Sequence, residues 1–407
     1  MLARHRLIAS VASGLLALAP TVPAAAQRTE TRAEFVGTLF SPNEQYENFN
    51  RINELFPTDR VAPSKKAQPW RKGRPIALPA HIEAQGETLD TAQFLRETDT
   101  AALLVLKDGK IRFEQYWLTG GRNVRWLSMS VAKSFVSAMI GIAVAEGRIA
   151  SISDPVTKYL PELVGSGYDG VSIKDILQMS SGVRWTEDYS DPKSDVFGLA
   201  HVMASGSSFA AFPATLSREH APGTFNRYNS TDTLVLGMLL ERATGTRLAK
   251  YMHDRLWEPL GATDEAYWLT DDHGMAMAFG GLNATARDFA RIGELYRKGG
   301  RWGGRQIVPA GWVKASLTSD SPHLMPGVRA SSDSEMGYGY QWWLPGFGDT
   351  QDYAAIGVYN QFIYVNPRER TVIVKLSANS NYGRTNDDRS WRGHDHFALF
   401  QALAKLK

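Results

Sequence analysis

A serine and a lysine stand three residues apart at the start of a long apolar segment, in Ser130-Val131-Ala132-Lys133. Residues 134–145 contain almost no polar side chain, which is typical of a helix that is buried on all sides. Because residues three apart share one face of an α-helix, both side chains can point into one cavity. Burial disfavours the ammonium form of a lysine, so its amine can accept a proton near neutral pH. The chain is therefore predicted to fold around a buried helix that presents a hydroxyl group beside an amine.

The same pattern occurs a second time, at Ser190-Asp191-Pro192-Lys193, and serves as an internal control. An Asp-Pro pair interrupts a helix and the surrounding residues are polar, so this copy is predicted to lie in a solvated loop. Nothing there would desolvate Lys193. For Ser130 and Lys133, the alternative to a nucleophile with its base is a helix-capping serine beside a lysine that extends to solvent.

A second candidate is Tyr228, which follows a Pro-Gly turn and precedes the apolar helix predicted over residues 234–240. A phenol at such a loop-to-helix corner can relay a proton between a nucleophile and a leaving group. Ser230 can orient that relay or the substrate. Tyr228 and Ser230 form the pattern Tyr-x-Ser, and the related pattern Tyr-x-Asn occurs at Tyr46 and Tyr364. However, Tyr46 falls in an irregular segment and Tyr364 in a predicted strand.

Taken together, these motifs resemble those of the serine β-lactamase and penicillin-binding superfamily, in its class C and esterase-like branch. More narrowly, the chain is similar to 6-aminohexanoate-dimer (nylon-oligomer) hydrolases. The resemblance covers roughly residues 95–407, and its motifs follow one another in the order of the family. The matching segments are 126–135, 176–183, 187–192, 279–285 and 360–367.

The resemblance implies roles for the residues that match. Ser130 would be the acyl-forming nucleophile, Lys133 its base and Tyr228 the proton relay. Ser230 stands where class C enzymes usually carry asparagine and the nylon-oligomer branch carries serine. Tyr189 matches an additional tyrosine of that branch, which could donate a hydrogen bond to an amide leaving group. The alternative for Tyr189 is a loop tyrosine that packs beneath a tryptophan.

The third motif departs from the family. Class C β-lactamases and peptidases place Lys-Thr-Gly, and esterases His-x-Gly, on the strand that lines the site, whereas residues 355–358 are Ala-Ile-Gly-Val. The cation that would hold a substrate carboxylate is missing from this stretch. Gly357 and Val358 are still expected to line the site, and the N–H groups of Val358 and Ser130 are the predicted oxyanion hole.

Strand patterns gather near the two ends of the predicted domain, and Asp108-Gly109 predicts the turn of a hairpin. Between them lies a mainly helical region over about 131–300, and a final helix is predicted over 396–405. The predicted strands are 103–106, 111–116, 339–344, 361–365 and 371–376. This layout predicts a β-lactamase/transpeptidase-like α/β fold. In it, an antiparallel sheet built from both chain ends is flanked by helices and interrupted by the inserted helical region.

The N-terminal segment has the pattern of a secretion signal. A short basic start is followed by the apolar residues 7–20, and the alanines up to Ala26 offer a cleavage site. We therefore predict a signal peptide over 1–26, cleavage after Ala26, and a periplasmic or secreted protein. Residues 27–75 are then predicted to form an irregular leader, and 76–407 a single serine-hydrolase domain with an ample core.

Composition excludes several classes of site. The 407 residues include no cysteine, which excludes disulfides, thiolate metal sites and a lipidated cysteine. The formal net charge is +3 with both signs interspersed, so a nucleic-acid partner is not expected. His394-Asp395-His396 lacks the helical spacing of a metal site, and neither a phosphate loop nor a Gly-x-Ser-x-Gly elbow is present. We expect no metal, no cofactor and no stable membrane anchor in the mature chain; the oligomeric state stays open.

These features predict an exported serine hydrolase that cleaves small esters or linear amides through an acyl-enzyme on Ser130. One alternative is a β-lactamase or D-alanyl peptidase that acts on cell-wall material. Another is a non-catalytic protein that binds peptidoglycan or β-lactams. A binding module needs no base beside a nucleophile, so the set of Ser130, Lys133 and Tyr228 disfavours this last class.

Overall fold

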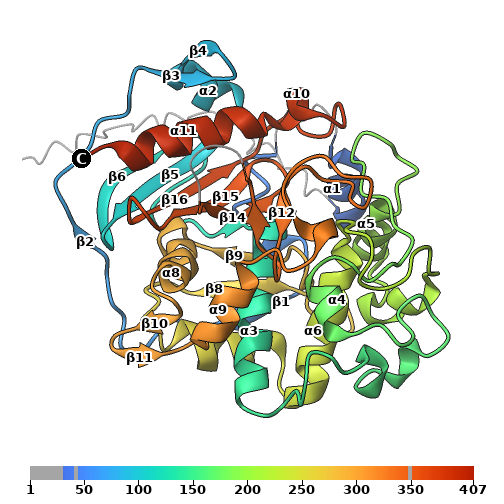
Figure 1. Cartoon of the computed structure of the whole chain (residues 1–407). Coiled ribbons are helices and arrows are strands. Elements are labelled where there is room, and N and C mark those ends of the chain that lie inside the picture. The colour runs from blue at the N-terminus through green and yellow to red at the C-terminus, as the bar shows by residue number, and fades with distance from the viewer. Residues whose placement is uncertain (1–30, 41–44, 347–350) are drawn as a thin grey trace, which may run out of the picture. The chain divides into compact units, whose positions relative to one another are not determined.

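A computed structural model describes residues 31–40, 45–346 and 351–407, and the predicted signal peptide lies outside these residues. Residues Thr31–Lys407 form one compact unit around an eight-stranded sheet (Figure 1). In spatial order its strands are β12 (Gly337–Tyr338), β13 (Trp343–Leu344), β14 (Tyr353–Gly357), β15 (Gln361–Asn366), β16 (Thr371–Ser377), β5 (Thr100–Lys107), β6 (Lys110–Tyr116) and β2 (Arg71–Lys72). Neighbours are antiparallel, except that β2 runs parallel to β6. The predicted antiparallel sheet from both chain ends is confirmed, with one parallel edge strand.

The hairpin of β5 and β6 shows how local sequence builds this sheet. Asp108-Gly109 forms its two-residue turn, with φ values of 51° and 69°, and such turns match the twist of the flanking strands. Side chains alternate between the faces of β5, so Leu103 and Val105 join one apolar cluster and Leu104 and Leu106 join the other. Both faces of the sheet are consequently buried.

Helices cover the two faces of the sheet. On one face lie α11 (Gly393–Lys405) and α2 (Thr91–Glu97), whose aromatic and aliphatic side chains pack against the strands (Figure 1). On the other face, α8 (Ala286–Arg297) contacts β15 and β16. The predicted final helix is thus confirmed, and it begins at Gly393.

The inserted region is mainly helical, as predicted. Its centre is α3 (Ala132–Ala145), which is buried from Ala132 to Ala143 and packs against α6 (Ser230–Thr244). Gly147, with a φ of 70°, ends this helix as a left-handed residue. The shorter helices are α4 (Ile173–Leu177), α5 (Val196–Ser205), α7 (Leu248–Met252), α9 (Ala310–Ser316) and α10 (Asp388–Trp391).

Several strands are too short to be recognised from an alternating pattern. A second sheet has the order β1-β8-β9-β7, and two hairpins, β3 with β4 and β10 with β11, stand apart. The bounds are β1 (Thr58–Val61), β8 (Ala266–Leu269), β9 (Leu282–Ala284), β7 (Trp126–Leu127), β3 (His81–Ala84), β4 (Glu87–Asp90), β10 (Arg301–Trp302) and β11 (Arg305–Gln306). Residues 31–75, within the predicted irregular leader, therefore contribute β1 and β2, and also the helix α1 (Arg32–Thr38), which packs against α5.

The prediction of one strand over residues 339–344 is wrong. The chain turns between β12 and β13, where Gln341 has a φ of 61°. Gly339 lies so close to the Ser316 carbonyl oxygen that an added Cβ would stand 1.9 Å from it. The left-handed Gln341 interrupts the segment, so residues 339–344 do not form one continuous strand. Among the described residues, no helix has both the length and the apolar composition needed to cross a membrane.

Candidate active site

Ser130 lies in a single 3₁₀ turn, Met129–Val131, that leads directly into α3. Met129 has a φ of 46°, in the left-handed region that residues other than glycine, asparagine and aspartate rarely adopt. Backbone strain of this kind persists only where the surrounding structure enforces it, and it is concentrated at functional sites. The strained turn therefore marks Ser130 as a residue whose position is held by its neighbours.

Lys133 is buried beside Ser130, with 2% of its surface exposed. Its Nζ atom lies 2.8 Å from Ser130 Oγ, 3.0 Å from Ser230 Oγ and 2.9 Å from the carbonyl oxygen of Phe279. Burial lowers the pKa of Lys133 to about 8, although the negative charge of Glu187 acts in the opposite direction. A neutral amine is thus accessible near physiological pH, and it is within reach of the Ser130 proton.

The start of α6 supplies two further predicted residues. Asn229 caps this helix, so Tyr228 stands just before it and Ser230 is its first residue. The ring of Tyr228 lies 4.9 Å from Lys133 Nζ, and Tyr228 and Ser130 line the same cavity. Burial raises the pKa of Tyr228 well above its usual value, so the phenol keeps its proton. The structure therefore brings all four polar side chains together.

Glu187 joins this group, although the sequence interpretation gave it no role. Its Oε1 atom accepts hydrogen bonds from Ser230 Oγ at 2.8 Å and from the Tyr189 hydroxyl at 2.5 Å. Its Oε2 atom accepts from the Trp185 indole at 2.8 Å and from the Ser230 N–H at 2.9 Å. Glu187 therefore orients Ser230 and places a negative charge near Lys133. The only sequence signal for it was its place at the start of a matching segment.

Tyr189 lies next to Glu187, and its ring packs against Phe40 and Tyr382, with centroid distances of 4.3 and 6.0 Å. Burial raises the pKa of Tyr189 well above its usual value. Its single hydroxyl proton is donated to Glu187 in this structure. Donation to a leaving group, the role that the resemblance implies, would therefore require Tyr189 to exchange this hydrogen bond.

The end of β14 lies directly against the turn that carries Ser130. At Gly357, an added Cβ would lie 2.7 Å from the Ser128 carbonyl oxygen and 3.0 Å from the Ser130 nitrogen. Only glycine allows the strand to approach so closely. The next residue, Val358, lines the cavity beside Ser130. The two N–H groups predicted for the oxyanion hole thus come from segments in contact.

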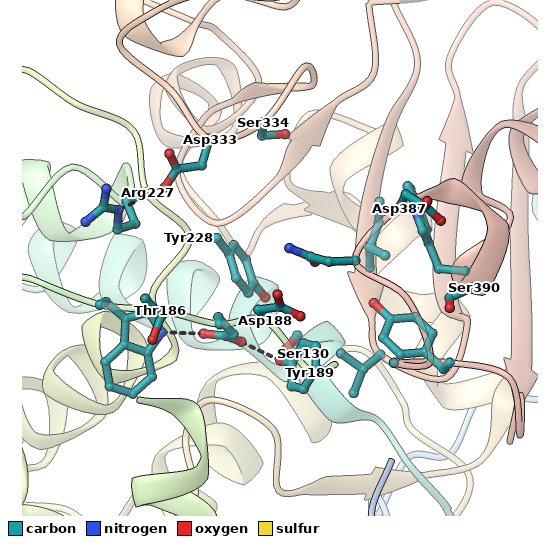
Figure 2. Close-up of a pocket in the computed structure, with 18 of the residues that line it drawn as sticks. Ser130, Thr186, Asp188, Tyr189, Arg227, Tyr228, Asp333, Ser334, Asp387 and Ser390 are labelled. Carbon is teal, nitrogen blue, oxygen red and sulfur yellow. Dashed lines mark hydrogen bonds and ion pairs between the residues drawn. The ribbon is translucent and has the colours of Figure 1, made fainter. Parts of the chain in front are cut away.

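Ser130 opens into a cavity of about 790 Å³, called the main cleft below, which is large enough for a small organic molecule (Figure 2). Figure 2 shows Ser130 and Tyr189 between Arg227 and Asp333 on one side and Asp387 on the other.

The stretch that was predicted as the third motif lines the main cleft. Ile356 and Gly357 of β14 and the next residue, Val358, line the cleft, and none of the three is a cation. Arg184 and Arg227 also line it, but both are ion-paired. Arg184 pairs with Asp195 at 3.0 Å, and Arg227 pairs with Glu219 and, at 2.8 Å, with Asp333. A carboxylate on a substrate would have to compete with these partners.

The second Ser-x-x-Lys copy is an exposed loop, as predicted, with both Ser190 and Lys193 in solvent. Within the part of the chain that the structure describes, no group of three or more histidine, aspartate or glutamate residues could hold a metal ion.

Comparison with known proteins agrees with the resemblance seen in the motifs. The β-lactamase family model matches residues 90–396. The 6-aminohexanoate-dimer hydrolase of Paenarthrobacter ureafaciens is 35% identical over 356 residues, which cover 85% of this chain and 87% of that protein. The β-lactamase of Escherichia coli K12 is 28% identical over 131 residues, or 32% of each chain. The chain therefore belongs to the β-lactamase family and is a hydrolase of this serine-hydrolase superfamily.

A solved structure supports the fold. A Bacillus anthracis protein, provisionally described as a 6-aminohexanoate-dimer hydrolase, superimposes with a TM-score of 0.78 at 21% identity, covering 90% of this chain and 96% of that chain. Similarity at this level of identity concerns the fold alone. The predicted family and its α/β fold are both confirmed.

Proposed function

We propose that this protein is a serine hydrolase that cleaves small esters or linear amides through an acyl-enzyme on Ser130. One observation carries the proposal. The Nζ atom of Lys133, whose pKa is lowered to about 8, lies 2.8 Å from Ser130 Oγ at the edge of the main cleft. A hydroxyl group paired with a desolvated amine is the arrangement that activates a serine nucleophile.

In the acylation step, the neutral amine of Lys133 takes the proton of Ser130, and Oγ attacks the carbonyl carbon of the substrate. The N–H groups of Ser130 and Val358 donate to the oxyanion that forms. Tyr228 then relays the proton to the leaving nitrogen or oxygen, which departs as an amine or an alcohol. Ser230, held by Glu187, keeps the Lys133 amine in place.

In the deacylation step, a water molecule attacks the ester carbonyl of the acyl-enzyme. It gives its proton to the pair formed by Lys133 and Tyr228, and Ser130 Oγ leaves and regains a proton. The products are a carboxylic acid and the free enzyme. The same groups thus act first as acid and then as base, as microscopic reversibility requires.

Linear amides are included because of the relationship to the Paenarthrobacter ureafaciens enzyme, whose name specifies a 6-aminohexanoate dimer. An amide is harder to cleave than an activated ester because its amine must be protonated to leave. Tyr189 is proposed to assist this protonation after it exchanges its bond with Glu187.

Cell-wall peptides and β-lactams are the alternative substrates, and the charge of the main cleft disfavours them. A charge-assisted contact to the substrate carboxylate is worth about 1.5–3 kcal/mol, so its absence lowers kcat/KM roughly ten- to a hundredfold. Short p-nitrophenyl esters should be cleaved fastest, linear amides more slowly, and penicillins or cephalosporins slowest. Efficient nitrocefin hydrolysis with weak esterase activity would reverse this order and favour a β-lactamase.

Labelling with a fluorophosphonate probe tests the central proposal. The parent protein should be labelled stoichiometrically at Ser130, and mass spectrometry of the labelled peptide identifies the residue. Labelling at another serine, or labelling of Ser130 without turnover of any ester, amide or lactam, would argue against the proposed enzyme. The second outcome would favour the non-catalytic binding protein.

Export is proposed on the pattern of the N-terminal residues, with cleavage after Ala26. Sequencing the N-terminus of protein recovered from periplasmic and culture fractions checks this. The expected N-terminal residue is Gln27. Uncleaved protein confined to the cytoplasm would contradict export.

A further inference from the structure

A second, smaller cavity adjoins the nucleophile. It has a volume of about 70 Å³ and shares Ser130, Tyr189 and Val358 with the main cleft. We call it the side cavity. Its far walls come from the end of the α1 segment, with Leu39 and Phe40, and from one face of α5. A chain attached to the carbonyl group that Ser130 attacks can therefore extend into it.

The side cavity is apolar. None of the described side chains that line it is charged. Two of its hydroxyl groups, those of Tyr189 and Ser230, already donate to Glu187. A polar group that entered would lose its hydration, and neither of these two hydroxyl groups has a free proton to donate to it. Each methylene group that entered would favour binding by roughly fourfold.

We propose that the side cavity binds the acyl chain of the substrate and selects an uncharged straight chain of about six carbons. The inference rests on the proposed acyl-enzyme, because it concerns the acyl group that Ser130 receives. The length follows from volume. A space of roughly 10–15 Å³ holds one water-sized group, so about 70 Å³ holds about five to seven such groups. A hexanoyl chain places five carbons beyond its carbonyl group.

The proposed acyl chain has an uncharged end. It differs in this from the 6-aminohexanoate dimer that the name of the Paenarthrobacter ureafaciens relative specifies. A 6-aminohexanoyl chain would bring an ammonium group to the apolar end of the side cavity. No carboxylate among the described lining residues would replace its lost hydration. The hexanoyl chain is therefore the better acyl group for this protein, although the two chains have the same number of carbons.

The N-terminal segment helps to form the side cavity. Residues 31–40 include α1, which packs against α5, and the ring of Phe40 packs at a tilt against Tyr189 with a centroid distance of 4.3 Å. This segment forms one wall of the side cavity, and α5 forms another. Both walls can be changed without altering Ser130, Lys133 or Tyr228.

A series of p-nitrophenyl esters from acetate to decanoate measures the chain-length preference, with kcat/KM normalised to the fraction of Ser130 that a fluorophosphonate labels. The parent should cleave hexanoate at least tenfold better than acetate and better than decanoate. Ala200→Leu fills the side cavity from α5 and should lower the hexanoate value about tenfold, with acetate changed less than twofold. His201→Leu adds the same side chain at the exposed neighbouring position and should keep the parent profile.

A change that enlarges the side cavity should have the converse effect. Leu39→Ala enlarges the side cavity and should move the optimum to a longer chain, and it supplies the test if Ala200→Leu fails to fold. The hexanoyl 4-nitroanilide should be cleaved at least tenfold better than the 6-aminohexanoyl 4-nitroanilide. Unchanged chain-length profiles in both variants, or a preference for the charged anilide, overturn the side cavity as the acyl site. Absence of Ser130 labelling in the parent instead overturns the acyl-enzyme.

Discussion

The two Ser-x-x-Lys copies of this chain have the same spacing but opposite surroundings. Lys133 is 2% exposed, and its Nζ atom contacts two serine hydroxyl groups and a carbonyl oxygen. Lys193 lies in an exposed loop, where its backbone N–H donates to the side chain of Asp191 at 2.9 Å. Burial lowers the pKa of Lys133 to about 8. The comparison indicates that reactivity comes from the buried helix and its neighbours rather than from the tetrapeptide.

Replacing the serine of each Ser-x-x-Lys copy with alanine should give the largest difference in activity. Ser130→Ala should abolish turnover and fluorophosphonate labelling, because the other serine hydroxyl beside Lys133, that of Ser230, already donates its proton to Glu187. Ser190→Ala, the matched change in the exposed loop, should retain the activity of the parent within about twofold. The measurement is kcat/KM on a short p-nitrophenyl ester. Comparable losses of kcat/KM in both variants would contradict the assignment of the nucleophile to the buried copy alone.

Replacing the lysine of each copy with alanine should give the next largest difference, in the acylation rate. Lys133→Ala should lower the acylation rate by about a hundredfold or more, as expected when a positioned base is lost. Lys193→Ala should stay within a few-fold of the parent. Stopped-flow acylation with an ester measures both rates. A mild effect of Lys133→Ala would assign the base role to another group.

The pH dependence sharpens the comparison. Lys133 acts as a base only when neutral, so kcat/KM should rise with pH, level off above about 8, and fall about tenfold per unit below that value. Glu187 raises the pKa of Lys133, so Glu187→Gln should move the midpoint to lower pH. Asp191→Asn, which removes an exposed acid from the control loop, should leave the midpoint unchanged. An upward shift in Glu187→Gln would contradict the assigned electrostatic role.

The smallest effect concerns the leaving group. Tyr189→Phe should reduce the cleavage of linear amides by several-fold and change the cleavage of p-nitrophenyl esters little, because a phenolate leaves without a proton donor. The ratio of kcat/KM for the two substrate types isolates this effect from changes in folding. Equal losses on both types would make Tyr189 a packing residue.

Local features made the central residues predictable. Ser130 and Lys133 are close in sequence, in a 3₁₀ turn and the buried helix that follows it, and Tyr228 stands just before the cap of another helix. The hairpin around Asp108-Gly109 was predictable for the same reason, because its turn residues are adjacent. Such features require only the periodicity and the breaking residues of a short segment.

Long-range contacts were not predictable. Glu187 touches Ser230, 43 residues away in the sequence, and nothing in either segment specifies that contact. Phe40 lies 319 residues from Tyr359, whose hydroxyl accepts its N–H. The second sheet was missed because its strands have two to four residues each, too few for an alternating pattern.

The contact between Gly357 and the Ser130 turn has a consequence for protein synthesis. A ribosome makes the nucleophile and its base early and the strand that supplies the second oxyanion donor much later. In the proposed mechanism, a partly made chain therefore carries Ser130 and Lys133 but has no complete site with which to acylate itself. Acyl transfer would begin only after the C-terminal strands have joined the sheet, and activity in a cell would report chains that have finished folding.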